Sequence, residues 1–387
     1  MGKAGSEVSS GRNRAVASLI LCVLFLLPYG GANAAELAGG SAADCQPCHA
    51  LIYEEWQQSW MARAYVNDNF QRSFQRWQQL IEQNPAAVQA NPMADPRRCL
   101  DCHAPLRRDD SEPDNPDGVT CQVCHTVRSA RPSRSGHTLI FDGRGVIYSA
   151  NPSPNRDAPH RLKYGSDLEN SRLCAGCHQD RLPTGLYLER TYDEWLQSPY
   201  ARQGIDCSDC HMPQTAGPAT AGTDTKPTHA SHRFAGGHSD SPLLARAATV
   251  RLQRNPDPRH ITVSVTNASV GHNFPTGGAH PNKLVLFFKL QNADGETVYE
   301  DSRIYQYRYL DANGRTVSPQ QLQDSTLQPL ETRREQFAIP ESLDATKATA
   351  RLEYHLIPDS LGRSLDPEIY ETSYAPVTID QDSLILK

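Results

Sequence analysis

Ten of the eleven cysteines in this chain occur in pairs separated by two residues, and a histidine follows each pair. Two thiols at this spacing lie about one helical turn apart, so each can form a thioether with a haem vinyl group while the adjoining imidazole reaches the iron. The predicted attachment points are Cys45, Cys48, Cys99, Cys102, Cys121, Cys124, Cys174, Cys177, Cys207 and Cys210. The predicted proximal iron ligands are His49, His103, His125, His178 and His211. The sequence therefore predicts five covalent c-type haems.

Disulfides and zinc sites are the other common uses of paired cysteines. A disulfide framework does not require a histidine after each pair. Zinc would take four ligands from two pairs, which leaves the five histidines without a role. Cys22, the eleventh cysteine, lies in an apolar N-terminal segment and is excluded from this chemistry.

The sixth coordination position of each iron decides between electron transfer and catalysis. Three histidines within ten residues follow the last motif, and another lies in a turn of rigid residues, Gly271 to Gly278. A thioether sulfur is an alternative ligand, and it would raise the potential of its haem. The candidate distal ligands are His160, His229, His232, His238, His272 and Met61. An exposed polar loop, a structural turn and methionine packing are the alternatives that stay open for these residues.

One internal repeat surrounds the motifs. Residues 53–63 (copy A) align with residues 192–202 (copy B), with matches at Tyr, Glu, Trp, Gln, Ser, Ala and Arg. In each copy Tyr and Trp are three residues apart, a spacing that places them on one face of a short helix. That face is expected to pack on a haem or on a neighbouring helix.

The chain divides at about residue 245. Residues 35–245 hold all five motifs, with many prolines and little periodicity, and predict a helical and irregular multihaem domain with little sheet. Residues 246–387 alternate apolar and polar side chains, as in His260 to Asn267, and predict an all-β antiparallel, immunoglobulin-like sandwich. The second and third motifs are closest in the chain, so their haems are expected to lie closest in space.

The N-terminus has the features of an export signal. Basic residues precede an apolar run from Ala15 to Leu27, and Ala32-Asn33-Ala34 offers a cleavage site, so residues 1–34 are predicted to be a signal peptide. The apolar run is too short to span a bilayer, and no transmembrane span is expected after cleavage. The formal charge of −6 disfavours nucleic-acid binding and favours a basic redox partner. We expect a periplasmic protein, or one exported to the cell surface.

The motif region resembles the multihaem cytochromes related to the tetrahaem cytochromes of the hydroxylamine-oxidation pathway, and more loosely pentahaem nitrite reductase. The resemblance covers residues 44 to 240 and rests on Cys45 to His49 with the aromatic residues that follow, Gly118 to Cys121, and Gly204 to Pro213. It extends to the turn at Gly271 to Gly277, which is similar to one in relatives that carry a C-terminal sandwich. Many relatives place histidine where this chain has Met61.

The resemblance implies electron transfer through stacked bis-histidine haems. Redox partner proteins, including a membrane-bound or outer-membrane electron-transfer complex, are the expected partners. Nitrite reductases of this kind use a Cys-x-x-Cys-Lys motif, which the chain lacks, and hydroxylamine oxidases carry more haems. The sequence therefore favours an electron carrier. The alternative is an oxidoreductase that binds a small nitrogen, sulfur or oxygen species at a haem with an open sixth position.

Overall fold

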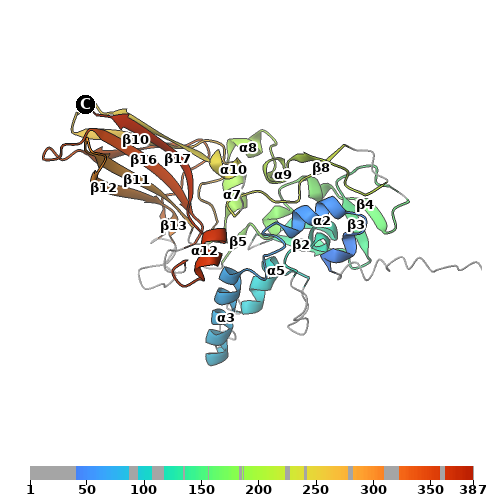
Figure 1. Ribbon diagram of the computed structural model, residues 1–387. Helices are drawn as coiled ribbons and strands as arrows, with labels where there is room; N and C mark the ends of the chain where they lie inside the picture. The colour runs from blue at the N-terminus through green and yellow to red at the C-terminus, as the bar shows by residue number, and fades with distance from the viewer. Residues whose placement is uncertain are drawn as a thin grey trace, which may run out of the picture.

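The computed structural model describes residues 41–86, 95–106, 117–133, 136–155, 157–182, 185, 187–222, 227–238, 242–277, 282–308, 322–357 and 362–386 (Figure 1). The predicted signal peptide, residues 1–34, lies outside the described residues.

Short helices dominate the part of the chain that holds the motifs. The α-helices there are α2 (Ala50–Gln57), α3 (Asp68–Gln83), α5 (Leu100–His103), α6 (Cys121–His125), α7 (Thr191–Leu196), α8 (Pro199–Arg202), α9 (Cys207–His211) and α10 (Pro242–Ala245). The 3-10 helices are η1 (Ala42–Cys45), η3 (Pro96–Cys99), η4 (Ser166–Glu169) and η5 (Cys174–Gly176). The longest of these, α3, begins where the side chain of Asn67 accepts a hydrogen bond from the Phe70 N–H, an N-cap that satisfies one free donor.

The strands of this region are short and occur in pairs. They are β1 (Val127–Pro132), β2 (His137–Phe141), β3 (Val146–Ser149), β4 (Arg161–Tyr164), β5 (Asp180–Arg181), β6 (Tyr187–Glu189), β7 (Gln214–Ala216) and β8 (Thr228–Ala230). The pairs are β1–β2, β3–β4, β5–β6 and β7–β8, of which only β3–β4 is parallel among the described strands. The region is therefore helical and irregular, as the sequence predicts.

Antiparallel sheets form the C-terminal part of the chain. One has the order β15–β10–β9 and the other β12–β11–β16–β17. Their strands are β9 (Ala248–Arg254), β10 (His260–Asn267), β11 (Lys283–Gln291), β12 (Thr297–Tyr305), β15 (Thr332–Ala338), β16 (Lys347–His355) and β17 (Val377–Ile385). A short pair, β13 (Tyr307–Arg308) with β14 (Gln323–Asp324), extends toward the motif region.

The two sheets share one apolar core. Ile261, Val263 and Val265 of β10 are buried at every second position, as the alternation in the sequence predicts. Phe288 of the larger sheet stacks on Phe337 of the smaller one at 4.4 Å between ring centroids, and both side chains are fully buried. This contact joins the sheets across the core.

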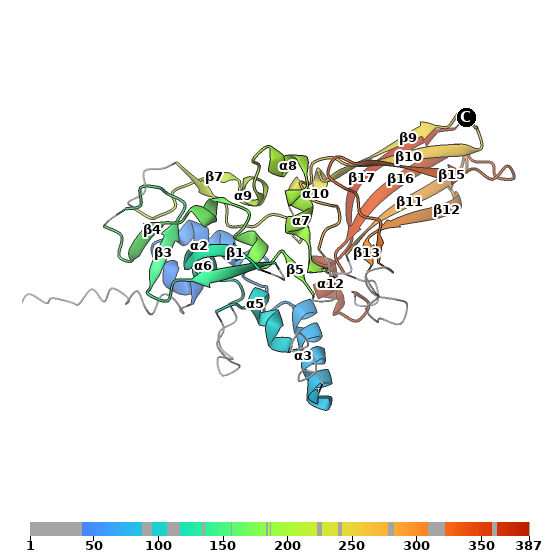
Figure 2. The ribbon, with the colours of Figure 1, turned by 180° about the vertical axis from the view of Figure 1, so that it is seen from behind.

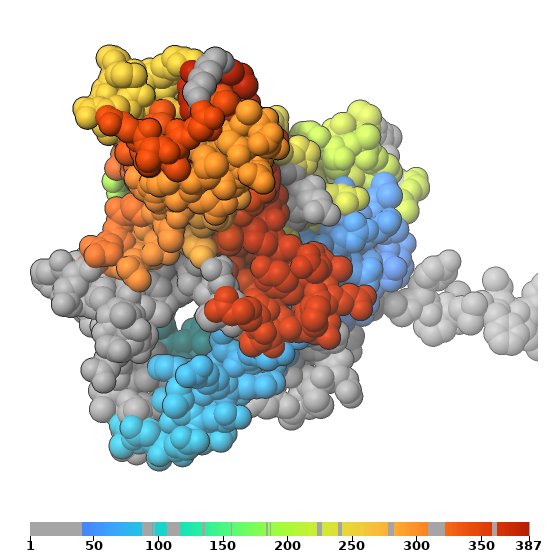
Figure 3. Space-filling view, turned by 60° about the vertical axis from the view of Figure 1, so that its left-hand side comes forward, coloured from blue at the N-terminus to red at the C-terminus, as the bar shows by residue number. Residues whose placement is uncertain are grey.

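The sheets lie beside the motif region, and α7, α8 and α10 lie near their junction (Figure 2). A second junction is formed by α12 (Pro367–Ser373), which approaches the N-terminal end of α3 (Figure 3). Tyr374, just after α12, packs edge-on against Trp60 at 5.8 Å. The two parts of the chain are thus in contact, which allows a residue of the sheet region to reach a motif.

Candidate haem-binding sites

Each motif lies on one turn of helix or beside one. Helices α6 and α9 span their motifs from the first cysteine to the histidine, and α5 ends at His103. One helical turn places both thiols and the imidazole on neighbouring positions, which is the arrangement that covalent haem attachment needs.

Proximal histidines use Nδ1 to bond a backbone carbonyl, as His49, His103, His125 and His211 show. The contacts are His49 with Ala219 (2.8 Å), His103 with Ala64 (2.8 Å), His125 with Tyr148 (2.8 Å), and His211 with Ala235. Because a carbonyl only accepts, Nδ1 must carry the proton in each ring, and Nε2 keeps its lone pair. A carbonyl on one ring nitrogen is the usual support for a histidine that binds metal through the other.

Two candidate distal histidines lie opposite proximal ones. The rings of His125 and His232 have centroids 6.3 Å apart and planes within 15° of parallel. The rings of His211 and His272 have the same centroid separation and planes within 10° of parallel. In both distal rings Nδ1 also bonds a carbonyl at 2.8 Å, which again leaves Nε2 for a metal.

The separation within these pairs is the one that an iron between them requires. Rings in direct contact lie closer, as Phe70 and His103 do at 4.0 Å. A metal at about 2.0–2.1 Å from Nε2 lies about 3 Å from the ring centroid, so two imidazoles on opposite sides of one iron have centroids roughly 6 Å apart. The residues therefore fit a bis-histidine haem at the third motif and another at the fifth.

Burial keeps these imidazoles neutral. It lowers the pKa of His125, and it lowers the pKa of both His232 and His272 to about 4. Burial is the largest cause of both values, and the nearby proximal histidine contributes to each. Neutral imidazole is the form that binds iron, so the rings need not lose a proton when they bind it.

His160 lies near the first motif. Burial lowers its pKa, followed by the charges of His49 and His125. Its Nδ1 is buried and has no hydrogen-bond partner among the described residues, a feature it shares with His137. A buried nitrogen without a protein partner is unfavourable unless a ligand satisfies it. His160 thus stays a candidate distal ligand, next to the haem of the first motif.

The remaining candidates have other surroundings. His229 bonds the Gly217 carbonyl through Nδ1 at 2.9 Å and Glu55 through Nε2 at 3.3 Å, so neither nitrogen is left for iron, and this arrangement speaks against the predicted ligand role. His238 packs against Trp60 at 5.0 Å. Met61 is half-buried, and its carbonyl accepts the N–H of Val119. Ligation by His238 or Met61 stays a prediction.

Thiols of different motifs lie in contact. The thiol of Cys45 lies close enough to that of Cys121 for each to shift the pKa of the other, as do Cys174 with Cys207, and the thiol of Cys102 lies close enough to shift the pKa of Cys177. Cys124 is close enough to Cys174 to contribute to the raised pKa of that thiol, after the Cys207 contact and burial. These contacts join the first motif to the third, and the fourth to the second, third and fifth. Cys102 of the second motif and Cys124 of the third both lie near Cys177, and the expected proximity of the haems on these two motifs stays a prediction.

The two repeat copies have the same local structure. Tyr53 and Trp56 have ring centroids 5.6 Å apart, and Tyr192 and Trp195 are 5.4 Å apart. The serine of each copy caps the turn that follows, with the hydroxyl accepting an N–H at 3.2 and 3.3 Å. This confirms the predicted helices with their aromatic face.

Each copy also holds the start of one motif. Trp56 Nε1 donates to the carbonyl of Val119 at 2.8 Å, and Trp195 Nε1 donates to that of Ile205 at 2.9 Å. Both carbonyls belong to the residue two positions before the first cysteine of a motif, the third for copy A and the fifth for copy B. The sequence places copy A next to the first motif, whereas the fold uses it to support the third.

The backbone contacts after the two copies are equivalent as well. Val119 N–H donates to the Met61 carbonyl at 2.9 Å, and Ile205 N–H donates to the Tyr200 carbonyl at 3.0 Å. In copy B the chain continues directly into the motif. In copy A residues 64–117, with α3 and the second motif, lie between the repeat and the motif it supports. The second motif is thus an insertion into the first of two similar units.

Asn267, at the end of β10, holds the turn that carries His272. Its fully buried side chain donates to the carbonyls of His272 (3.1 Å) and Leu327 (3.2 Å) and accepts the N–H of Val270 (3.0 Å). The sheet therefore fixes the turn from behind. Nothing in the sequence marked Asn267, because a single asparagine at a strand end is common in loops.

Arg190 ties copy B to the sheet region. Its guanidinium contacts Glu194 at 2.5 Å and Asp324 at 2.7 Å and lies over the Tyr307 ring at 4.0 Å. Burial raises the pKa of Glu194 to about 7, although Arg190 and the hydrogen bond from Thr276 oppose the shift. The match of Glu194 with Glu55 in the repeat is the one feature of the sequence that points to this residue.

Stability should therefore depend on pH through Glu194. The folded protein holds this proton with a pKa of about 7 and the unfolded chain with one near 4.5, so stability decreases as the pH rises between these values and is level above them. Glu194→Gln removes this dependence. Relative to the wild type, the variant should gain up to about 3 kcal/mol between pH 5 and pH 8, measured by urea unfolding. If the variant and the wild type differ in unfolding free energy by the same amount at pH 5 and at pH 8, Glu194 is not the group responsible.

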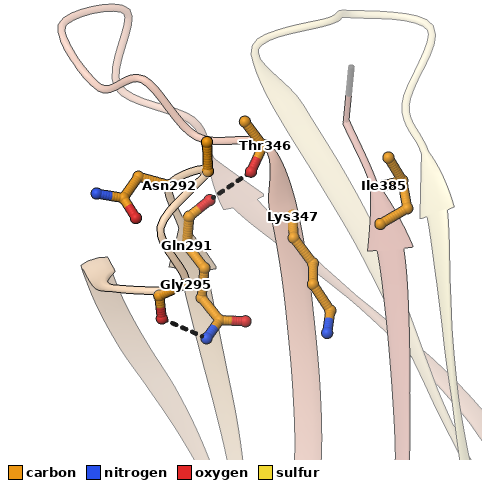
Figure 4. A pocket seen from close by; sticks show the side chains of 7 residues that line it. Gln291, Asn292, Gly295, Thr346, Lys347 and Ile385 are labelled. Carbon is orange, nitrogen blue, oxygen red and sulfur yellow. Dashed lines mark hydrogen bonds between the residues drawn. The ribbon is translucent and has the colours of Figure 1, made fainter.

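A shallow pocket lies elsewhere, at the end of the sheets where the chain terminates (Figure 4). It is lined by Gln291, Asn292, Ala293, Gly295, Thr346, Lys347 and Ile385. None of these residues belongs to a motif. Within the described part of the chain, no helix has both the length and the apolar character needed to cross a bilayer.

Residues 44–126, which include the first three motifs and copy A, match the family model "Cytochrome c554 and c-prime". No curated protein matches the chain. A solved structure of a penta-heme cytochrome c552 from Thermochromatium tepidum has the same fold, with a TM-score of 0.68 and 22% identity, over 90% of this chain and 100% of that one.

Two further structures are matched at low similarity. They are the putative ApaA protein from Bordetella pertussis (19% identity, 36% of this chain, 89% of that chain, TM-score 0.17) and a putative beta-galactosidase from Bacteroides fragilis (13%, 38%, 16%, TM-score 0.15). Scores this low show no shared fold. The motifs, the family match and the fold of the penta-heme structure agree: this chain is a multihaem c-type cytochrome that carries a cytochrome c554 and c-prime segment at residues 44–126.

Proposed function

We propose that this protein transfers electrons between redox partners through five covalently bound haems. When bound, each haem supplies an iron that alternates between ferrous and ferric states. The observation that carries the proposal is the pair of opposed imidazoles at the third and fifth motifs, His125 with His232 and His211 with His272. Two protein ligands leave an iron no position for a substrate, which suits electron transfer.

The arrangement of the motifs supports the same function. Thiol contacts connect the first motif to the third, and connect the fourth to the fifth and the second. Cys124 lies near Cys174, which brings the third motif close to the fourth. Haems on motifs so placed would be neighbours. The protein's own contribution is to ligate, orient and bury the groups.

We place the protein outside the cytoplasm, in the periplasm or at the cell surface, because residues 1–34 have the features of an export signal. The acidic formal charge of −6 suits a partner with a basic docking surface. A membrane-bound or outer-membrane electron-transfer complex is the redox partner that we propose for this location.

We also propose that residues 35–245 and 246–387 are two domains, the second an immunoglobulin-like sandwich. Two sheets of three and four strands with one core support this division. The change at residue 246 falls between α10 and β9. In this protein the second domain would also donate His272 to the fifth haem.

Electron paramagnetic resonance of the purified ferric protein tests the function. We expect five haems per chain by pyridine haemochrome assay and only low-spin signals, because every iron would have two protein ligands. A high-spin signal in the intact protein would contradict the proposal. It would favour instead an oxidoreductase with one open haem, and addition of nitrite, hydroxylamine or sulfite would then have to change that signal.

A further inference from the structure

A buried carboxylate occupies the same position in both repeat copies. Glu55 in α2 precedes Trp56, and Glu194 in α7 precedes Trp195. Their side chains are only 11% and 7% exposed. Carboxylates are rarely buried unless several donors bind them. The donors to these two carboxylates therefore show which segments of the chain each glutamate holds.

In copy A the donors come from the segment that carries His232. Glu55 Oε2 accepts the backbone N–H of His232 itself at 2.8 Å. The same oxygen lies 3.3 Å from Nε2 of the buried His229. His232 is the residue whose ring lies opposite His125 of the third motif.

In copy B, Glu194 contacts Arg190 through Oε1, and the donors to its other oxygen come from the turn that carries His272. Glu194 Oε2 accepts the backbone N–H of Asn273, the next residue, at 3.2 Å and the hydroxyl of Thr276 at 2.5 Å. His272 is the residue whose ring lies opposite His211 of the fifth motif. Each carboxylate thus bonds the backbone at the distal histidine or one residue after it.

Duplication of the helix does not by itself explain this agreement. His232 lies in a loop after β8, and His272 lies in a turn between two strands of the sheet region. The sequences around them, Ala-Ser-His-Arg and Val-Gly-His-Asn, share only the histidine. Two segments of unrelated sequence therefore donate a backbone N–H to the matching glutamate of each copy. In both cases this N–H belongs to the histidine whose ring is opposite a proximal histidine or to the residue after it.

The same helices also hold the proximal side. Trp56 and Trp195, the residues directly after the two glutamates, donate to the backbone just before the third and the fifth motif. In each copy, one short helix is thus hydrogen bonded both to the segment that carries the proximal histidine and to the segment that carries the distal one. The distance between the two imidazoles, 6.3 Å in both cases, is then fixed by adjacent residues of one rigid element.

We propose that Glu55 and Glu194 are positioning residues that hold His232 and His272 at the distal side of the haems on the third and fifth motifs. The inference rests on the proposed function, because it takes these histidines as iron ligands. Neither glutamate touches the iron. Each acts through the backbone of the distal-histidine segment.

Carbon monoxide binding to the dithionite-reduced protein tests the proposal, because it counts irons whose sixth ligand has been lost. His232→Ala should bind one more equivalent per chain than the wild type. Glu55→Ala should show most of the same gain, since the loop loses its anchor and leaves an unsatisfied N–H. Glu55→Gln keeps an acceptor oxygen and should remain close to the wild type. Glu54→Gln, one residue away and exposed, is the matched control and should bind as the wild type does.

The double variant Glu55→Ala with His232→Ala should bind no more than His232→Ala alone, because both changes open the same iron. If His232→Ala binds the extra equivalent of carbon monoxide but Glu55→Ala binds no more than the wild type, Glu55 does not position His232. The assignment of His232 as an iron ligand would then still hold. No gain in His232→Ala would overturn the assignment itself. If Glu55→Ala does not retain its haem content, Glu55→Asp, which has a shorter side chain, takes its place. The same comparison can also be made at the fifth motif with Glu194→Ala and His272→Ala.

Discussion

His272→Ala should convert the haem of the fifth motif from low-spin to high-spin, with one new high-spin iron per chain. The ring of His272 lies 6.3 Å from that of His211, its Nδ1 donates to the Asn273 carbonyl, and among the described residues no hydrogen bond to its Nε2 is seen. Alanine leaves the sixth position without its nitrogen. Loss of this donor should also raise the midpoint potential of that haem by on the order of 0.1 V, within the roughly 0.8 V range that axial ligands control.

Paramagnetic resonance and a potentiometric titration measure both effects. His272→Met should remain low-spin and still raise the potential, because a thioether stabilises ferric iron less than imidazole does. The control is His260→Ala: His260 lies in the same sheet region but bonds Asp257 at 2.9 Å, and its loss should leave every haem unchanged. A wild-type spectrum from His272→Ala would show that another residue ligates this iron.

Phe288→Ala should destabilise the sheet region by about 3–5 kcal/mol, the usual range for removal of a buried phenylalanine. The ring is fully buried between the sheets and stacks on Phe337 at 4.4 Å. Alanine would leave a cavity in the core that joins the sheets. Because the turn with His272 is held by Asn267 of β10, unfolding of the sheets should also release the distal ligand of the fifth haem.

Urea unfolding followed by the β-sheet signal in far-ultraviolet circular dichroism and by the high-spin absorption band measures both consequences. Unfolding of the sheets and appearance of the high-spin band of the fifth haem should occur at the same urea concentration. Both should shift to lower urea in the variant. Phe287→Ala is the matched control, since its ring lies on the opposite face, half-buried beneath Arg351, and should cost less than about 1.5 kcal/mol. A high-spin band that appears well before or after the sheets unfold would show that the turn is held independently of them.

The repeat shows how far a local pattern predicts structure. Tyr and Trp three residues apart predicted two short helices with an aromatic face, and both are present. The same alignment contained Glu55 and Glu194, whose role did not follow from it, because their partners come from segments far along the chain. Likewise, the density of histidines in residues 229–238 indicated a ligand segment without separating His232 from His229. Only the fold shows that Glu55 bonds the ring of one and the backbone of the other.

The five Cys-x-x-Cys-His motifs determine the class of this protein by themselves, because covalent attachment and proximal ligation involve five consecutive residues and need only one turn of helix. The alternating strands after residue 246 are determined in the same local way. The positions of His232 and His272 opposite proximal histidines, the neighbours of each motif, and the partners of Glu55 and Glu194 depend on the tertiary structure. Each of these closes a long loop, and loop closure depends on how the whole chain packs rather than on the residues at its ends.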